Sequence, residues 1–218
     1  MSDFIQEITT QDGSKTLLNL KLDECFHSTY GAETEANIVF IKHGLNLFKN
    51  SNINILEVGY GTGLNAKLSF KENQKLNNKI FYVGLDILKL SKNHTEINDN
   101  LLDDFWSGKK FSEVSNEWET QHKLSDNFIL IKKNISIQKF ESELKFDLVY
   151  FDAFSPDKQP EMWSEEIFNK IFSLLKPNGI LVTYSSKGTV KRGLRSAGFE
   201  VIRLKGPPNK KHVLRAFK

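Results

Sequence analysis

The chain has 218 residues, of which 39% are hydrophobic, and it carries a formal net charge of +3 at pH 7. This length fits one α/β domain with small appendages, and two full domains would be cramped. Cys25, the single cysteine, excludes an intramolecular disulfide and a cysteine-based zinc site, and the lack of a leader or a membrane-length apolar run indicates a soluble cytoplasmic protein.

The first part of the chain predicts an appendage to the core. Residues 3–22 alternate weakly between apolar and polar positions around an Asp-Gly pair, which is a strong hairpin turn signal. Apolar residues at helical spacing over 38–48 predict a lead-in helix that packs on a sheet. We expect Tyr30 and Glu35, which lie between these elements, to close over a cofactor or an acceptor base. A plain connector fits the spacing equally well.

An apolar run over residues 53–58 ends in a glycine-rich turn, and a helix follows from Leu64. Glycine permits positive φ and lets a ligand approach where any Cβ would collide. The Gly-x-Gly-x-Gly spacing differs from that of dinucleotide folds and lacks the lysine of a triphosphate loop. It matches the first motif of S-adenosylmethionine-dependent methyltransferases, with a purely structural turn as the alternative. The cofactor contacts expected here are Glu57, Gly59, Tyr60, Gly61, Thr62, Gly63 and Asn65.

The next strand, residues 80–85, ends in Asp86. A carboxylate at this strand tip can accept from both ribose hydroxyls, each such bond contributing about 1.5–3 kcal/mol. It can also cap a following helix. Residues 89–123 look helical and polar and show no recognisable chemistry. A third strand over 128–131 leads to Asn134, the nearest candidate for the adenine contact that an acid usually makes in methyltransferases.

A fourth apolar strand, residues 146–151, ends in Asp152. In open α/β sheets the carboxyl ends of the strands form the ligand crevice, so we expect Asp152 to face the same cleft as Glu57 and Asp86. An aspartate that only caps its own loop is the alternative. Two prolines stiffen the loop that follows, and Ser164 suits the N-cap of the next helix.

The remaining elements complete a sheet. They are a turn over 176–179, a strand over 180–185, a helix over 188–197 and a hairpin made of 199–204 and 212–217. Such a hairpin at one edge of a seven-stranded, mostly parallel sheet is the usual end of a class I, Rossmann-like methyltransferase. We therefore predict this α/β fold over residues 51–218, preceded over residues 1–50 by a small β-hairpin and the lead-in helix.

Positive charge is concentrated at the end of the chain. Residues 187–218 contain ten Lys and Arg side chains against one acid, Glu200. Such a run is commonly only a solvated surface. Because an enzyme-like core precedes it here, a face for nucleic-acid phosphates stays open beside that interpretation.

Four blocks of sequence together resemble one family, the tRNA (5-methylaminomethyl-2-thiouridine) methyltransferases, which form the methyltransferase half of the bifunctional wobble-uridine enzymes. The blocks are Phe26-His27-Ser28 with Gly31, Ala32 and Glu35; Glu57 to Asn65; Asp152-Ala153-Phe154-Ser155-Pro156 with Pro160 to Trp163; and Thr183-Tyr184-Ser185 with Lys191-Arg192-Gly193-Leu194. The similarity runs from about residue 15 to the end, and residues 206–212 depart from the family pattern. Bifunctional members add a flavin-dependent oxidase domain, whereas the resemblance here covers the methyltransferase half alone. We therefore expect a stand-alone methyltransferase with a separate oxidase as a possible partner.

The resemblance implies methyl transfer from S-adenosyl-L-methionine to the exocyclic amine of 5-aminomethyl-2-thiouridine at uridine 34, in the anticodon stem-loop of a tRNA, without a metal. Asp152 would contact the cofactor and act as the catalytic residue that orients the amine. Aromatic side chains would stack on the extruded base and basic ones would bind phosphates. The substrate contacts expected on this basis are Tyr30, Glu35, Phe154, Ser155, Pro156, Trp163, Lys187, Lys191, Arg192, Lys210 and Lys211.

Two other functions stay open. A small-molecule N- or O-methyltransferase would act on a free metabolite, and the basic tail would then be incidental. A non-catalytic module would bind the cofactor or RNA and methylate nothing in bulk tRNA. The intact glycines and carboxylates argue against this loss of activity.

Overall fold

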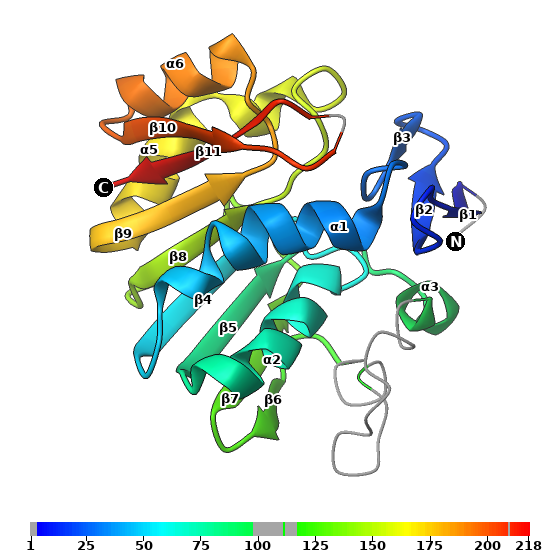
Figure 1. Ribbon diagram of the computed structural model, residues 1–218, viewed down its shortest axis with the longest axis horizontal. Helices are drawn as coiled ribbons and strands as arrows, with labels where there is room; N and C mark the ends of the chain where they lie inside the picture. The colour runs from blue at the N-terminus through cyan, green and yellow to red at the C-terminus, as the bar shows by residue number, and fades with distance from the viewer. Residues whose placement is uncertain (1–3, 98–110, 112–116, 209) are drawn as a thin grey trace.

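The computed structural model describes residues 4–97, 111, 117–208 and 210–218. Its core is an eight-stranded sheet with the order β10-β11-β9-β8-β4-β5-β7-β6, and a three-stranded sheet lies to one side (Figure 1). The predicted α/β class with a mostly parallel sheet is confirmed. The five parallel strands are β4 (Asn52–Val58), β5 (Lys79–Leu85), β7 (Phe128–Lys133), β8 (Phe146–Phe151) and β9 (Leu175–Thr183).

Antiparallel strands close both edges of the large sheet. At one edge β10 (Glu200–Lys205) and β11 (His212–Phe217) form the predicted hairpin, and β11 pairs with β9. At the other edge β6 (Gln121–Ser125) pairs with β7 and makes the eighth strand. The prediction of a helix over 89–123 was wrong for residues 121–123, which begin β6. The polar sequence of β6 buries only Leu124 and so lacks a strand pattern. Residues 98–110 and 112–116 of the expected helical stretch lie outside the described residues.

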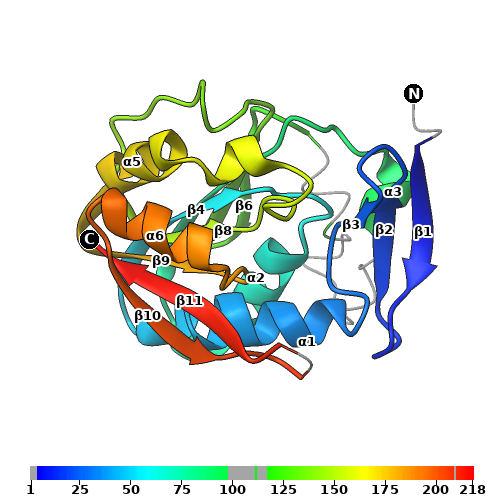
Figure 2. The same cartoon turned by 90° about the horizontal axis from the view of Figure 1, so that it is seen from above.

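Helices cover both faces of the sheet (Figure 2). One core contains buried residues of α1 (Ala32–Ala36), of the π-helical segment Asn37–Lys42 and of α2 (Leu64–Leu76). The other contains buried residues of α5 (Glu165–Leu174) and α6 (Gly188–Ser196). Short helical segments occupy the connections, at Leu45–Leu47, α3 (Lys92–Glu96) and Pro160–Trp163.

The start of α5 follows the sequence prediction. The hydroxyl of Ser164 accepts a hydrogen bond from the backbone N–H of Ile167, which satisfies one of the free donors of the first turn. Apolar residues three or four positions apart, including Ile167 and Ile171, are buried against the sheet. The cap and this apolar stripe therefore fix where the helix begins and which face it buries.

The N-terminal appendage is a three-stranded antiparallel sheet of β1 (Ile5–Thr9), β2 (Lys15–Asn19) and β3 (Glu24–Cys25). The predicted hairpin is thus present and gains a short third strand. The domain boundary at residue 50 stays a prediction. Across the described part of the chain, no helix has the length and apolar character needed to cross a membrane.

Candidate active site

The turn after β4 ties three strand tips together. The amide groups of Gly59 and Tyr60 both donate to the carbonyl oxygen of Leu85 at the end of β5, at 3.0 Å each. The amide of Asp152, after β8, donates to the carbonyl oxygen of Val58 at 2.9 Å. Gly59 has a φ of +91°, and a Cβ there would collide with the carbonyl oxygen of Asp152. Glycine is required at this position because neighbouring backbone approaches so closely.

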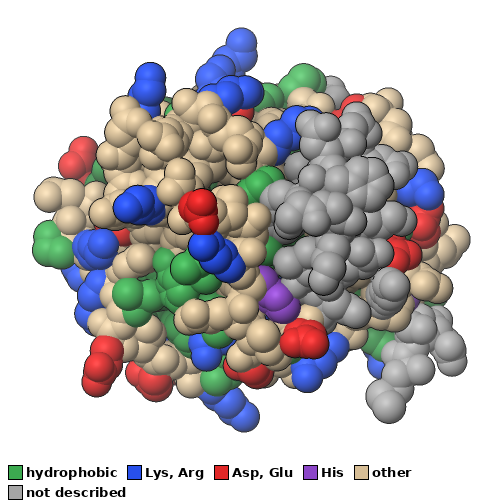
Figure 3. Space-filling model, turned by 90° about the horizontal axis from the view of Figure 1, so that it is seen from below, with side chains coloured by type: hydrophobic (Ala, Val, Ile, Leu, Met, Phe, Trp, Pro, Cys, Tyr) green, Lys and Arg blue, Asp and Glu red, His purple; other side chains and the backbone are tan. Residues whose placement is uncertain are grey.

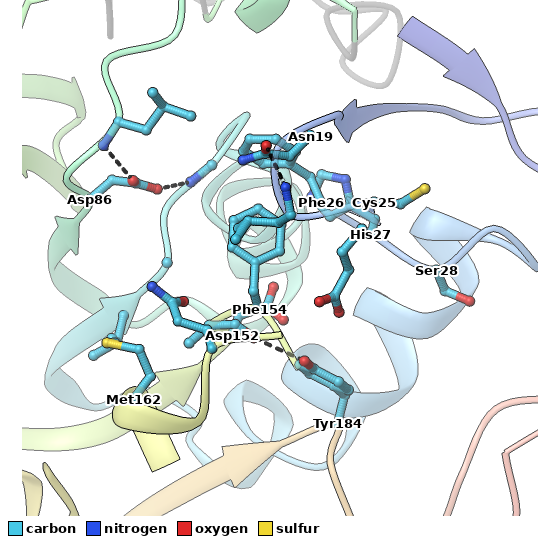
Figure 4. A pocket seen from close by; sticks show the side chains of 18 of the residues that line it. Asn19, Cys25, Phe26, His27, Ser28, Asp86, Asp152, Phe154, Met162 and Tyr184 are labelled. Atoms are coloured by element: carbon cyan, nitrogen blue, oxygen red, sulfur yellow. Dashed lines mark hydrogen bonds between the residues drawn. The ribbon is translucent and has the colours of Figure 1, made fainter. Parts of the chain in front are cut away.

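Asp86, at the tip of β5, supports the glycine turn. One carboxylate oxygen accepts from the amide of Gly61 and the other from the amide of Leu88, both at 2.8 Å (Figure 4). Burial raises the pKa of Asp86, and these backbone hydrogen bonds oppose the rise. Asp86 caps no helix, because the next one, α3, begins at Lys92 with Ser91 as its N-cap. A carboxylate oxygen can accept a second hydrogen bond, so Asp86 keeps free capacity for a diol.

Asp152 is a carboxylate with an unusually high pKa. Burial raises the pKa of Asp152 to about 7, and the charge of Glu35 adds to the rise. A 2.9 Å hydrogen bond from the side-chain amide of Asn65 and the charge of Lys210 act in the opposite direction. At neutral pH the carboxyl group is therefore divided between its two protonation states, which suits a group that accepts a proton.

Glu57 lies beneath the site and does not line its cavity. It is fully buried, and its carboxylate accepts from the Tyr82 hydroxyl and from the Asn65 amide, both at 2.8 Å. Burial raises its pKa well above the usual value. Glu57 is therefore not placed for the direct cofactor contact that the sequence predicted. It extends into the core with Tyr82, on the same face of adjacent strands. Glu57 acts on the site through Asn65.

A cavity of about 860 Å3 opens at these strand tips. Gly59, Gly61, Asp86 and Asp152 all line it, so Asp152 shares a cleft with Asp86 as predicted, whereas Glu57, the third carboxylate expected there, does not line it. Figure 4 shows Phe26, His27 and Ser28, which follow β3, on the wall facing Asp152. Among the described residues, the lining holds one Lys or Arg, Lys210, against these carboxylates: Asp23, Glu24, Glu35, Asp86, Asp152 and Glu161. The cavity is therefore suited to positively charged ligands.

The N-terminal sheet is attached to the loop that follows Asp152. The carboxylate of Glu24 accepts from the Ser155 amide at 3.0 Å and from the Ser155 hydroxyl at 2.9 Å. The rings of Phe26 and Phe154 meet edge to face, with centroids 5.1 Å apart. These contacts hold the loop in place and close one side of the cavity.

Several predicted cofactor contacts do not line the cavity: Glu57, Tyr60, Thr62, Gly63, Asn65 and Asn134. The Tyr60 ring packs over Gly84 and meets Trp118 edge to face, so it belongs to the core. The Asn134 amide donates to the backbone carbonyl of Asp86 at 2.9 Å. The residues directly after Asn134, 135–138, line the cavity instead, and the sequence did not point to them.

The predicted substrate residues also divide. Tyr30, Glu35, Phe154 and Lys210 line the cavity, whereas Ser155, Pro156, Trp163, Lys187, Lys191, Arg192 and Lys211 do not. Trp163 is 8% exposed and donates to the carbonyl oxygen of Phe154 at 2.7 Å, so the expected stacking of Trp163 on a base is corrected. Ser155 is held by Glu24, and the side chain of Lys187 pairs with Asp157.

Tyr184 and His27 line the cavity and were missed as site residues. Both occur in the sequence blocks that carry the family resemblance, and that was the signal available. The Tyr184 hydroxyl donates to the carbonyl oxygen of Ala153 at 2.9 Å. Burial lowers the pKa of His27 to about 4, with the charge of Lys67 adding to the effect, so the ring is neutral at physiological pH.

Comparison with known proteins gives the class. The family described as S-adenosyl-L-methionine-dependent methyltransferase matches residues 92–218, more than half of the chain. The chain therefore belongs to the S-adenosyl-L-methionine-dependent methyltransferases, and S-adenosyl-L-methionine is its cofactor. More specifically, it carries a methyltransferase domain like that of MnmC, which confirms the predicted family resemblance.

The relatives show how much of the chain this likeness covers. The bifunctional protein MnmC of Campylobacter hominis, named for tRNA 5-methylaminomethyl-2-thiouridine biosynthesis, is 29% identical over 198 residues, or 84% of this chain and 28% of that protein. The structure of MnmC2 from Aquifex aeolicus has a TM-score of 0.74 and 26% identity, covering 97% of this chain and 70% of that one. A methyltransferase from Pyrococcus furiosus shares the fold, with a TM-score of 0.56 and 18% identity over 87% of this chain and 84% of its own. The chain thus spans less than a third of the bifunctional Campylobacter hominis relative.

The residues around the cavity fit the cofactor. Gly59 and Gly61 keep the corner free of Cβ atoms, and a Cβ at Gly61 would lie 3.2 Å from the ring of Phe26. Asp86 offers acceptors to a ribose, and the acidic lining suits the positive charge of a sulfonium. We expect the glycine turn and Asp86 to hold S-adenosyl-L-methionine at the end of the cavity bounded by Asp152.

Proposed function

We propose that this protein methylates the exocyclic amine of 5-aminomethyl-2-thiouridine at the wobble position of tRNA. The observation that carries the proposal is the position of Asp152, which lines the same acidic cavity as the glycine corner and Asp86. A cavity with this lining disfavours anionic acceptors and favours an amine. The Campylobacter hominis relative is named for tRNA 5-methylaminomethyl-2-thiouridine biosynthesis, which supports the choice of nucleoside.

The reaction is a displacement at carbon, in which S-adenosyl-L-methionine supplies an electrophilic methyl group. The lone pair of the amine forms the new N–C bond while the electrons of the C–S bond pass to sulfur. The amine must be neutral, and neutralising one with a lysine-like pKa of ~10.4 at pH 7 would cost about 4–5 kcal/mol. Because the reaction is a displacement between two bound groups, the main contribution of the protein is to align them.

Asp152 has two roles in this proposal. Its carboxylate accepts an N–H of the amine, which orients the lone pair, and it stabilises the positive charge that grows on nitrogen during transfer. The proton then passes from the methylated nitrogen to Asp152. A pKa of about 7 makes this carboxylate a competent acceptor at neutral pH, since it neither stays fully protonated nor is too weakly basic.

The tRNA would be bound outside the cavity by the basic end of the chain. Lys191, Arg192 and Arg195 lie on α6, and the pKa of Lys191 is lowered mainly by the charge of Arg195, a sign of concentrated positive charge. Figure 3 shows the opposite face of the molecule from Figure 2. On that face the Lys and Arg side chains are scattered among Asp and Glu. This contrast favours docking of RNA phosphates near α6, with the wobble base extruded into the cavity.

The test uses labelled S-adenosyl-L-methionine and tRNA from cells that lack the modification, followed by nucleoside analysis by mass spectrometry. Label in 5-methylaminomethyl-2-thiouridine, lost in Asp152→Asn, is the expected result. Methylation of a free metabolite without RNA would favour a small-molecule methyltransferase. Cofactor binding with no methylation of this tRNA would favour a binding module. A separate flavin-dependent oxidase partner and a cytoplasmic location stay predictions.

A further inference from the structure

Lys210 lines the cavity, and its ammonium group contacts two other lining residues, Glu35 and Tyr184. Lys210 lies between β10 and β11, and its Nζ is 2.6 Å from Oε2 of Glu35. The same nitrogen lies 4.6 Å from the centre of the Tyr184 ring. The two ionic side chains are 31% and 14% exposed, respectively, so the pair is partly shielded from water. A primary ammonium thus contacts both a carboxylate and an aromatic face within the substrate cavity.

The two groups that receive this ammonium are held in place. The Tyr184 hydroxyl donates to the Ala153 carbonyl, and the ring meets Trp163 edge to face with centroids 5.9 Å apart. Glu35 lies on α1, which packs against α2. A fixed carboxylate beside a fixed aromatic face is the usual arrangement for binding an alkylammonium group.

We propose that Glu35 and the Tyr184 ring form a subsite for the primary ammonium of the substrate, the protonated form in which it enters before it loses the proton for methyl transfer, and that Lys210 fills this subsite until RNA phosphates attract its side chain outward. The proposal rests on the proposed function, because it takes the acceptor to be a primary amine. Lys210 is the only Lys or Arg among the described residues that line the cavity.

This arrangement makes amine binding depend on RNA. Lys210 belongs to the same loop as the exposed Lys211, so its ammonium can exchange the Glu35 carboxylate for a phosphate at the surface. A free nucleoside offers no such phosphate and must compete with Lys210 for the subsite. The protein therefore discriminates against free amines in favour of the same amine carried on tRNA.

The test measures binding of the nucleoside 5-aminomethyl-2-thiouridine by calorimetry, in the presence of S-adenosylhomocysteine. If Lys210 fills the subsite about nine-tenths of the time, Lys210→Met binds the nucleoside roughly tenfold more tightly than the native protein. Glu35→Gln binds it more weakly, because the carboxylate that receives the amine is lost. Lys205→Met, which removes an exposed charge from the same hairpin, leaves the affinity unchanged. Uridine, which lacks the amine, shows no gain in Lys210→Met.

Equal or weaker nucleoside binding in Lys210→Met would overturn the proposal, as would unchanged binding in Glu35→Gln. Methylation of tRNA is measured separately in the native protein. Methylation together with unimproved binding in Lys210→Met would reject the subsite alone. Tighter binding in Lys210→Met without methylation of tRNA would support the subsite and reject the proposed reaction.

Discussion

The side-chain nitrogen of Asn65 donates to two carboxylates, to Glu57 at 2.8 Å and to Asp152 at 2.9 Å. Burial raises the pKa of both acids, and the hydrogen bond from Asn65 opposes that rise in each case. Asn65 therefore connects a carboxylate in the core to one in the cavity. We infer that it lowers the pH at which Asp152 becomes charged.

The first prediction concerns the pH profile of kcat/KM. The proposed mechanism requires the carboxylate form of Asp152, so activity should rise as pH passes through about 7, the pKa of Asp152 in the free protein. Asn65→Ala removes the bond that lowers this pKa, and the rise should move to higher pH. Ser69→Ala, which removes a buried hydrogen bond with Tyr150 from the same helix, serves as the control. An unshifted profile in Asn65→Ala would contradict the role assigned to Asn65.

The second prediction concerns the glycine turn. Gly59→Ala forces a Cβ against the carbonyl oxygen of Asp152 at a φ of +91°, so it should lower both the free energy of unfolding and the affinity for S-adenosylhomocysteine. Gly13→Ala is the matched control, since Gly13 has a similar φ of +82° and nothing within 4 Å of its Cβ position. The difference between the two variants in urea unfolding isolates the collision. Equal losses would mean that backbone strain alone explains the requirement for glycine at residue 59.

The success of the sequence analysis at this turn has a physical cause. A buried strand, three glycines and Asp86 follow one another along the chain, and parallel strands bring their carboxyl ends to one edge of the sheet. The convergence of Gly59, Asp86 and Asp152 on one cavity could therefore be predicted without coordinates.

Side-chain direction could not be predicted in the same way. Tyr60 and Trp163 lie in segments that border the cavity, yet both rings fill the core, since the turn geometry around them decides which way each side chain extends. The contribution of Glu24 was also missed. It reaches the site through a contact with Ser155, 131 positions along the chain, and no local pattern encodes such a pairing.

The third prediction concerns Asp86 and the ribose of the cofactor. Asp86→Ala should weaken binding of S-adenosylhomocysteine by about tenfold or more, given roughly 1.5–3 kcal/mol for each charged hydrogen bond lost. Part of this loss will arise because Asp86→Ala also removes the acceptor of the Gly61 and Leu88 amides. A 2′-deoxy ligand separates the two effects in a double-mutant cycle measured by calorimetry. The penalty for removing the hydroxyl should disappear in Asp86→Ala, and strictly additive losses would contradict the ribose contact.

The last prediction concerns the attachment of the N-terminal sheet to the loop after Asp152. Glu24→Ala removes the acceptor of the Ser155 amide and hydroxyl, so the loop should lose its fixed position. The KM for tRNA should rise several-fold, consistent with about 1–3 kcal/mol for a donor left without its partner. The affinity for S-adenosylhomocysteine should change little, because the glycine corner is tied to Leu85 and Asp86 and not to Glu24.

Glu7→Ala is the matched control for Glu24→Ala. Glu7 lies in the same small sheet and pairs with Lys15 at 2.6 Å, but the two side chains are 43% and 49% exposed, and exposed ion pairs contribute little. Steady-state kinetics and calorimetry on both variants separate the acceptor side from the cofactor side. If Glu24→Ala weakened both sides equally, the sheet would support the cavity as a whole. A selective rise in KM would show that the sheet positions the loop that follows Asp152.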